Sequence, residues 1–233
     1  MGARSWRSGL NASGHSRGLE LCRVVKTFGE RRLLDIEART FPAGELHLMQ
    51  GDNGAGKTTL LKILAGLQNA DTLEFRFNGL RYTQANYPDA LRREIVYVHQ
   101  HPYLFSTSVA ANIGYGLKLR NVPLQQRENA ITDAIRWAGL VDVAAVAPKR
   151  LSGGEKQRVA LARALVLNAP VMLIDEPTAN LDAKARDQVR ALLESLRAEG
   201  RIVVVATHDP ALIALPGATS WQLMDGKLSC LSA

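Results

Sequence analysis

The chain is 233 residues long, 46% of its residues are apolar, and its formal net charge at pH 7 is +7. This length and composition suit one compact globular unit with room for a subdomain. The longest apolar runs, residues 171–174 and 202–206, are far shorter than the ~20 residues that span a bilayer, so the composition predicts no transmembrane helix.

Residues 1–18 are rich in serine and glycine and carry three arginines without an acidic residue. Such a composition predicts a disordered tail, and the segment lacks the apolar stretch of a secretory signal. A solvated extension is the simplest interpretation, while a contact with lipid or nucleic acid stays open. The two cysteines, Cys22 and Cys230, stand near opposite ends of the chain without metal-ligand spacing, which favours free thiols.

A strand, a glycine-rich loop and a helix are predicted in succession over residues 45–67. The strand pattern "ELHLMQ" is followed by "GDNGAGKTT" at 51–59 and by the helical pattern "LLKILAGL". The loop has the spacing G-x-x-x-x-G-K-T, in which glycines let successive backbone N–H groups point inward at phosphates. In this arrangement Lys57 reaches the β and γ phosphates, and the Thr58 hydroxyl can bind Mg²⁺. A glycine-rich turn that merely starts a helix would leave Lys57 and the two threonines unexplained.

Two further elements precede a second glycine motif. The run "EIVYVHQHPYLF" at 94–105 predicts a strand that ends with Gln100, whose neutral amide can bind metal or hold water. The run "PLQQRENAITDAIRWAGL" at 123–140 has a helical pattern. At 151–165, "LSGGEKQRVALARAL" predicts an amphipathic helix that begins after Ser152. Because a helix N-terminus presents unpaired N–H groups and partial positive charge, Gly153 and Gly154 mark a second place suited to an anion.

Polar side chains follow two apolar strands near the end of the chain. The run "VMLIDEPTANLD" at 171–182 predicts a strand buried on both faces that ends in Asp175 and Glu176. Adjacent carboxylates can divide the work of phosphoryl transfer, Asp175 holding Mg²⁺ through water and Glu176 polarising the attacking water. The run "RIVVVATHDP" at 201–210 predicts another buried strand, followed by His208, which is either structural or a contact to the γ-phosphate. Near the C-terminus, Asp225-Gly226 predicts a hairpin turn.

These motifs, in this order, resemble the ATP-binding cassette, the nucleotide-binding subunit of ABC transporters. The resemblance extends from about residue 19 to the C-terminus. Its most specific part is "LSGGEKQR" at 151–158, which matches the family's signature motif and is absent from other phosphate-loop ATPases. By match, residues 51–59 are the Walker A loop and Gln100 is the Q-loop glutamine. Asp175 and Glu176 match the Walker B aspartate and the catalytic glutamate, Asp182 matches the D-loop, and His208 matches the switch histidine.

The resemblance implies roles for three sets of residues. The residues expected to contact ATP are Phe28, Gly51, Asp52, Asn53, Gly54, Ala55, Gly56, Lys57, Thr58, Thr59, Ser152, Gly153, Gly154 and Asp182. The residues expected to act in catalysis are Glu176, His208, Gln100 and Lys57, and those expected to bind the metal are Thr58, Gln100 and Asp175. Phe28 stands where the family places an adenine-stacking aromatic, more commonly tyrosine, and a core position in an N-terminal β region is the alternative.

The implied fold is α/β: a RecA-like core of the P-loop NTPase type, an antiparallel β subdomain, and an inserted α-helical subdomain at about residues 101–168. The ATP-binding domain would cover residues 19–233 after the tail at 1–18, with no regulatory domain following the C-terminal hairpin. The implied cofactors are ATP and Mg²⁺. ATP is expected to close a dimer of identical or homologous cassettes, in which the signature of each faces the γ-phosphate held by the other.

The implied function is ATP hydrolysis that drives transport through separate integral membrane permease subunits. The chain is expected to be a peripheral protein on the cytoplasmic face of the membrane, and no nucleic acid is expected as a partner. Residues 101–120 resemble the segment of bacterial importers in which Tyr103, Leu104 and Phe105 would line a groove for the permease, or would pack within the subdomain. The short chain resembles oxyanion importers, particularly of tungstate or molybdate, which work with a periplasmic binding protein. Three alternatives stay open: an exporter of the lipoprotein-releasing type, a soluble ATPase outside transport, and a non-hydrolysing cassette.

Overall fold

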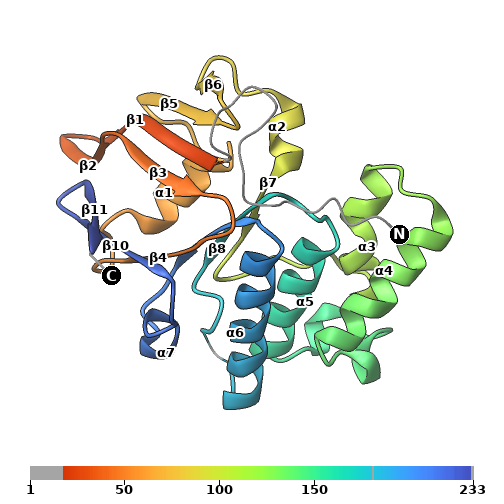
Figure 1. The fold of residues 1–233 in the computed structure, drawn as a ribbon. Helices are drawn as coiled ribbons and strands as arrows, with labels where there is room; N and C mark the ends of the chain where they lie inside the picture. Colours follow the sequence, from red (N-terminus) through yellow and green to blue (C-terminus); the bar gives the residue numbers. More distant parts are fainter. Residues whose placement is uncertain (1–17, 180, 232–233) are drawn as a thin grey trace. The chain divides into compact units, whose positions relative to one another are not determined.

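The structure is a computed structural model that describes residues 18–179 and 181–231 (Figure 1). The tail predicted at 1–18 therefore lies outside the described residues, except for Gly18. The described residues form two compact units, and each is presented by itself. The first unit extends up to Tyr97 and includes Pro170–Glu176 and the residues from Arg190 onward, while the second contains Val98–Ala169 and Pro177–Val189.

An antiparallel sheet forms one part of the first unit. Its long strand β1 (Gly18–Phe28) pairs with β2 (Arg31–Ile36), β3 (Arg39–Pro42) and β5 (Thr72–Phe77). The strand β6 (Leu80–Thr83) extends the sheet beyond β5, as the red to yellow strands of Figure 1 show. This sheet supplies the antiparallel region that the family resemblance implies.

The second sheet of this unit has the strand order β11-β10-β4-β9-β8-β7. Its strands are β4 (Leu46–Gln50), β7 (Ile95–Val98), β8 (Val171–Asp175), β9 (Ile202–Ala206), β10 (Thr219–Met224) and β11 (Lys227–Leu231). The strands β10, β4, β9 and β8 run parallel. Every residue of β8 and β9 is buried, as expected for apolar strands covered on both faces. Their carboxyl ends therefore lie at one edge of the sheet.

One apolar core joins the two sheets with helix α1 (Lys57–Leu64). Leu60, Leu61, Ile63 and Leu64 of α1 are buried in it. His47 of β4 is also fully buried, with its ring centroid 5.0 Å from that of Phe41, and its Nδ1 accepts a hydrogen bond of 3.3 Å from the indole N–H of Trp221. The short helices α2 (Asp89–Glu94) and α7 (Pro210–Ile213) complete this unit.

The C-terminal hairpin follows the sequence prediction. Met224 pairs with Lys227, and the connecting residues Asp225 and Gly226 have φ values of 49° and 76°. Two positive φ angles are typical of a type I′ turn, whose twist matches that of the strands it joins. The predicted turn at Asp225-Gly226 is therefore confirmed.

The second unit is mainly helical. Its helices α3 (Val109–Leu119), α4 (Leu124–Trp137) and α5 (Gly153–Leu165) pack on one another, as the green and teal helices of Figure 1 show, around a core that includes Val109, Ile113, Leu140 and Val159. Two 3₁₀ turns, η1 (Val141–Val143) and η2 (Pro148–Arg150), connect α4 to α5. The helix α6 (Ala183–Ala198) contributes residues to both units.

Three smaller predictions can be compared with the structure. The strand predicted to end at Gln100 stops at Val98. The polar residues 99–101 have no apolar side chain to bury, and Pro102 has no N–H to donate to a neighbouring strand. Cys22 and Cys230 are free thiols, as predicted. Among the helices of the described residues, none combines the length and the apolar character needed to cross a membrane.

Candidate active site

The phosphate loop follows β4 and leads into α1, as the sequence predicts. Its glycines Gly51, Gly54 and Gly56 have φ values of 147°, 80° and 109°, in the region that side chains rarely adopt. A Cβ at Gly51 would also overlap the carbonyl oxygen of Leu223 in β10. The loop conformation thus depends on glycine both for backbone geometry and for close contact with a neighbouring strand.

The start of α1 is open to an anion. Gly56 is the N-cap residue in a left-handed conformation, and no side chain within the described part of the chain caps the helix. The first-turn N–H groups have no partner inside the helix, and the helix dipole adds partial positive charge at the same end. A phosphate group would satisfy both features.

The ammonium group of Lys57 is held against the loop. This side chain is 8% exposed, and its Nζ donates to the carbonyl oxygens of Gly51 at 2.5 Å and Asp52 at 3.1 Å. It also lies 3.0 Å from Nε2 of His208. Burial lowers the pKa of Lys57, and the nearby carboxylates of Glu176 and Asp175 oppose that effect. The loop carbonyls therefore hold a cation beside the first turn of α1.

Asp175, the last residue of β8, connects three elements of the first unit. It is 2% exposed, and its Oδ2 accepts hydrogen bonds from the hydroxyl of Thr58 at 2.6 Å and from that of Tyr97 at 2.9 Å. Burial and the negative charge of Asp175 raise the pKa of Tyr97, so the phenol keeps its proton and remains a donor. Sequence reasoning missed Tyr97. A hydroxyl-bearing residue in the strand "IVYV" was the available signal, but the sequence does not reveal that β7 neighbours β8.

Glu176 has an unusual backbone at the end of β8. Its φ is 45°, a left-handed value that is uncommon for a residue with a side chain, and its N–H donates to the carbonyl of Ala206 at 2.9 Å. Its Oε2 accepts a 3.3 Å hydrogen bond from the backbone N–H of His208, and its Oε1 lies 3.7 Å from His208 Nε2. Burial raises the pKa of Glu176. Among the described residues, Oε1 has no hydrogen-bond partner.

The structure thus brings together five of the predicted site residues at the carboxyl edge of the parallel sheet: Lys57, Thr58, Asp175, Glu176 and His208. Phe28 lies at the end of β1 with half of its surface exposed, which does not fit the alternative of a core aromatic.

The predicted residues Gln100, Ser152, Gly153, Gly154 and Asp182 belong to the second unit, whereas Asn53, Ala55 and Thr59 lie in the loop and in α1 of the first unit. Gln100 is half-buried, just after β7. Ser152 is the N-cap of α5, and its hydroxyl accepts from the N–H of Glu155 while the Glu155 carboxylate accepts from the N–H of Ser152. This capping box leaves the N–H groups of Gly153 and Gly154 to other acceptors. Oδ1 of Asp182 accepts from the N–H of Ala185 at 2.8 Å, in the first turn of α6.

A phosphate loop between a parallel strand and a helix, beside a carboxylate at the end of another strand, defines the class of phosphate-loop proteins that bind nucleoside triphosphates. A model of the ABC transporter family matches residues 35–179. The chain belongs to this family.

Curated relatives and solved structures place the chain among ATP-binding cassettes. The chain is 37% identical over 199 residues to the sulfate/thiosulfate import ATP-binding protein CysA of Salmonella typhi, covering 82% of this chain and 53% of that protein. It is 38% identical over 190 residues to CysA of Mycobacterium tuberculosis (strain ATCC 25618 / H37Rv), covering 81% of this chain and 53% of that protein. The chain therefore spans about half the length of these relatives.

Two solved structures of one cassette match nearly the whole chain. The dimeric structure of MJ0796, a bacterial ABC transporter cassette, has a TM-score of 0.83 and 30% identity, covering 92% of this chain and 99% of that one. A dimeric post-hydrolysis state of MJ0796, bound to ADP and Pi, has a TM-score of 0.82 and the same identity and coverage. The predicted fold class, a P-loop α/β core with antiparallel and helical parts, is confirmed. Homologous cassettes of this family are ATPases.

Proposed function

We propose that this chain hydrolyses ATP and thereby drives the import of a small oxyanion through a separate membrane permease. The observation that carries the proposal is the cluster in the first unit, where Lys57 contacts His208, His208 contacts Glu176, and Thr58 contacts Asp175. These are the side chains that phosphoryl transfer needs for charge, metal binding and orientation of water. Family membership and the similarity to CysA support the proposal.

ATP binding follows from the loop and from α1. The inward N–H groups of residues 51–59 and the first turn of α1 would hold the β and γ phosphates. Lys57 would exchange the carbonyls of Gly51 and Asp52 for phosphate oxygens, which are stronger acceptors because they are charged. Phe28 offers an exposed ring on which adenine would stack.

The site also fits Mg²⁺. The hydroxyl of Thr58 and the carboxylate of Asp175 are hard oxygen donors 2.6 Å apart. From the family resemblance alone, we propose the amide oxygen of Gln100 as a further ligand. Bound there, Mg²⁺ would neutralise charge on the β and γ phosphates. The hydrogen bond from Tyr97 fixes the carboxylate of Asp175 from the side of β7.

Glu176 would act as the general base. Burial raises the pKa of its carboxyl group, which brings its basicity closer to that of a group able to take a proton from water at neutral pH. The backbone N–H of His208 holds one oxygen of this carboxylate, and the ring of His208 lies beside the other. Water oriented by Glu176 would attack the γ-phosphate in line and pass its proton to Glu176, while His208 would contact the γ-phosphate.

The signature residues would complete the site of a second cassette. The capping box at Ser152 and Glu155 leaves the amides of Gly153 and Gly154 to bind an anion, and the phosphate loop already serves the nucleotide of its own subunit. We propose that Ser152, Gly153 and Gly154 contact the γ-phosphate held by a partner cassette, and that Asp182 lies at the same interface. The dimeric structures of MJ0796 support the pairing of two cassettes.

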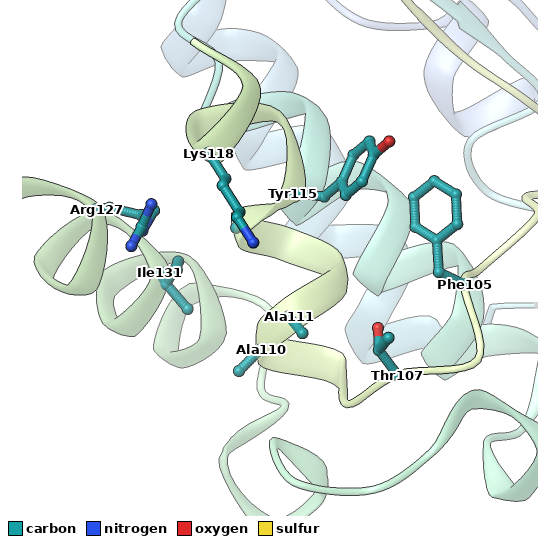
Figure 2. A pocket seen from close by; sticks show the side chains of 9 residues that line it. Phe105, Thr107, Ala110, Ala111, Tyr115, Lys118, Arg127 and Ile131 are labelled. Atoms are coloured by element: carbon teal, nitrogen blue, oxygen red, sulfur yellow. The ribbon is translucent and has the colours of Figure 1, made fainter. Parts of the chain in front are cut away.

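A groove in the second unit would receive the permease. It has a volume of about 450 Å³. The rings of Phe105 and Tyr115 line it, with their centroids 4.4 Å apart (Figure 2). Lys118 of α3 and Arg127 of α4 line it, and within the described residues its lining contains no acid. An apolar helix carrying one acidic residue would fit this charge pattern. Of the other two residues expected there, Tyr103 is exposed, whereas Leu104 packs against the helical core.

The proposed substrate is a tetrahedral oxyanion. The curated relatives are named for the import of sulfate and thiosulfate, and tungstate and molybdate have the same geometry and charge as sulfate. We propose this class, with tungstate or molybdate as the particular substrate. The choice among these anions would be made by the permease and a periplasmic binding protein. The cassette would then act at the cytoplasmic face of the membrane.

Replacing Glu176 with glutamine tests the ATPase assignment. The Glu176→Gln variant should bind ATP, hydrolyse it about 100-fold or more slowly because it has lost the general base, and accumulate as a dimer. Glu194→Gln, at an exposed position of α6, is the matched control and should hydrolyse ATP normally. Near-normal turnover by Glu176→Gln would contradict the assignment.

Transport is tested in cells that make the protein. Uptake of radiolabelled sulfate, molybdate and tungstate should be compared between wild type and Glu176→Gln, and the variant should abolish uptake of one of them. The tagged chain should also be purified from membranes to identify its permease. Unchanged uptake of all three anions, or a permease with a large periplasmic domain typical of lipoprotein release, would overturn the proposal of oxyanion import.

A further inference from the structure

The exposed ring of Phe28 lies beside the ammonium group of Lys26. Lys26 and Phe28 are two residues apart on β1, so their side chains project from the same face of the strand. The ammonium Nζ of Lys26 lies 4.8 Å from the centroid of the Phe28 ring, in a cation–π contact. Phe28 nevertheless remains 50% exposed.

Lys26 is itself held in place. Its side chain is only 15% exposed, and its Nζ lies 3.8 Å from Oδ1 of Asp71, the residue before β5. The other carboxylate oxygen of Asp71 accepts a 2.6 Å hydrogen bond from the backbone N–H of Thr27, and the N–H of Asp71 donates to the carbonyl of Val25 at 2.9 Å. One aspartate therefore contacts three consecutive residues of β1, directly before Phe28.

These contacts lie where the pairing of β1 is irregular. Between Lys26 and Thr27 the register with β2 shifts, because the pairing passes from Leu34 to Arg32 and skips Leu33. The extra residue, Leu33, is on β2, and a bulge of this kind bends the bulged strand and increases the local twist of the pair. Asp71 contacts the chain from the β5 side at the same point, and thereby fixes the end of β1 from which Phe28 projects.

We propose that Asp71 and Lys26 are positioning residues for the nucleobase: they hold the Phe28 ring so that one face is closed by the ammonium group and the other is presented to the base. This inference rests on the proposed binding of ATP and deepens it. A ring that is already ordered loses less freedom when a base stacks on it, so part of the affinity for the base would come from these two side chains.

The base and the phosphates can be tested separately with two probes, ATP and inorganic tripolyphosphate, in the presence of Mg²⁺. Both would occupy the phosphate loop, but only ATP carries a base. Measurements of equilibrium binding should show that Phe28→Ala, which removes the stacking ring, weakens ATP binding about tenfold or more. Asp71→Ala and Lys26→Met should weaken ATP binding about three- to tenfold. The affinity for tripolyphosphate should change less than about twofold in all three variants.

Two further variants refine the test. Asp71→Asn keeps a carbonyl acceptor for the N–H of Thr27 but loses the charge beside Lys26, so its loss of ATP affinity should fall between those of wild type and Asp71→Ala. Asp89→Asn removes an exposed aspartate that pairs with Arg92 one turn away, and should leave both probes unaffected. A general loss of structure in Asp71→Ala would weaken the binding of tripolyphosphate together with that of ATP. Equal losses of affinity for the two probes would therefore overturn the positioning role.

The outcomes separate this inference from the proposed function. If wild type bound neither probe, the proposed binding of ATP would fail. If wild type bound ATP no better than tripolyphosphate, the assignment of Phe28 to the base would fail. If Phe28→Ala lost ATP affinity while Asp71→Ala and Lys26→Met kept it, only the positioning role would fail. Tighter ATP binding by Lys26→Met would mean that the ammonium group and the base compete for the same face, which would also overturn the inference.

Discussion

Protonation of His47 should destabilise the first unit as the pH falls. The His47 ring is fully buried, Nε2 lies 3.4 Å from the carbonyl of Pro42, and Nδ1 accepts from the indole N–H of Trp221. A neutral imidazole that carries its proton on Nε2 satisfies both partners. A second proton on Nδ1 would face another donor inside an apolar cluster, so the neutral form is strongly favoured.

The size of the effect follows from the shift in pKa. Burial lowers the pKa of His47 from 6.5 to about 4. Above pH 6.5 the side chain is neutral in both the folded and the unfolded chain, so it has no effect. Below that pH the unfolded chain binds a proton that the folded chain excludes, and the free energy of unfolding falls. At about 1.4 kcal/mol per pH unit, the loss reaches about 2 kcal/mol at pH 5 and approaches about 3 kcal/mol near pH 4.

Urea unfolding followed by circular dichroism at pH 7.5 and pH 5 measures this loss. Other groups titrate in the same range, so wild type should be compared with His47→Gln, which keeps one donor and one acceptor but does not titrate. The fall in unfolding free energy between the two pH values should be about 2 kcal/mol smaller in His47→Gln than in wild type. His101→Gln, at an exposed position, should behave like wild type. Equal pH dependence in wild type and His47→Gln would refute the reasoning.

Three further variants test other contacts. Gly51→Ala should lower the free energy of unfolding by about 3 kcal/mol, and Gly54→Ala by about 1 kcal/mol. Both positions have a positive φ, but only at Gly51 would a Cβ also overlap a backbone carbonyl. Equal losses of the two variants in urea unfolding would contradict this. Tyr97→Phe should raise the Mg²⁺ concentration needed for half-maximal ATP binding about three- to tenfold, because Asp175 loses a hydrogen bond. Tyr82→Phe is the control and should leave this concentration unchanged. An unchanged Mg²⁺ titration in Tyr97→Phe would show that Asp175 does not need this bond. Ser152→Arg should spare ATP binding by the monomer and abolish dimer-dependent hydrolysis; loss of monomer binding would instead assign this loop to the pocket of its own subunit.

Local patterns were enough to predict the chemistry-bearing segments. The apolar runs that became β8 and β9, the glycine loop before α1 and the Asp225-Gly226 turn depend on neighbouring residues in the sequence, and the structure contains each of them. Placing Asp175, Glu176 and His208 at one edge of a parallel sheet needed only the rule that buried apolar strands run side by side.

Contacts between distant segments could not be predicted in the same way. The hydrogen bond of Tyr97 to Asp175 depends on β7 being the neighbour of β8, and the support of Phe28 by Asp71 depends on the pairing of β1 with β5. The alternation in "ELHLMQ" is typical of a strand with one exposed face, but His47 is buried because Phe41 and Trp221 cover it. The left-handed backbone of Glu176 likewise goes with a hydrogen bond from its N–H to Ala206 on another strand.

The order of strands also affects when the protein can fold during its synthesis. The strand β4, which leads into the phosphate loop and ends at Gln50, lies between β9 and β10, which begin only at Ile202 and Thr219. A ribosome makes β4 long before its two neighbours, so the strand cannot pair on either side until β9 and β10 have been made. The contact between Gly51 and Leu223 is subject to the same delay. A nascent chain that has not yet reached β9 would therefore carry the whole phosphate-binding sequence without the two strands that hold its loop in place.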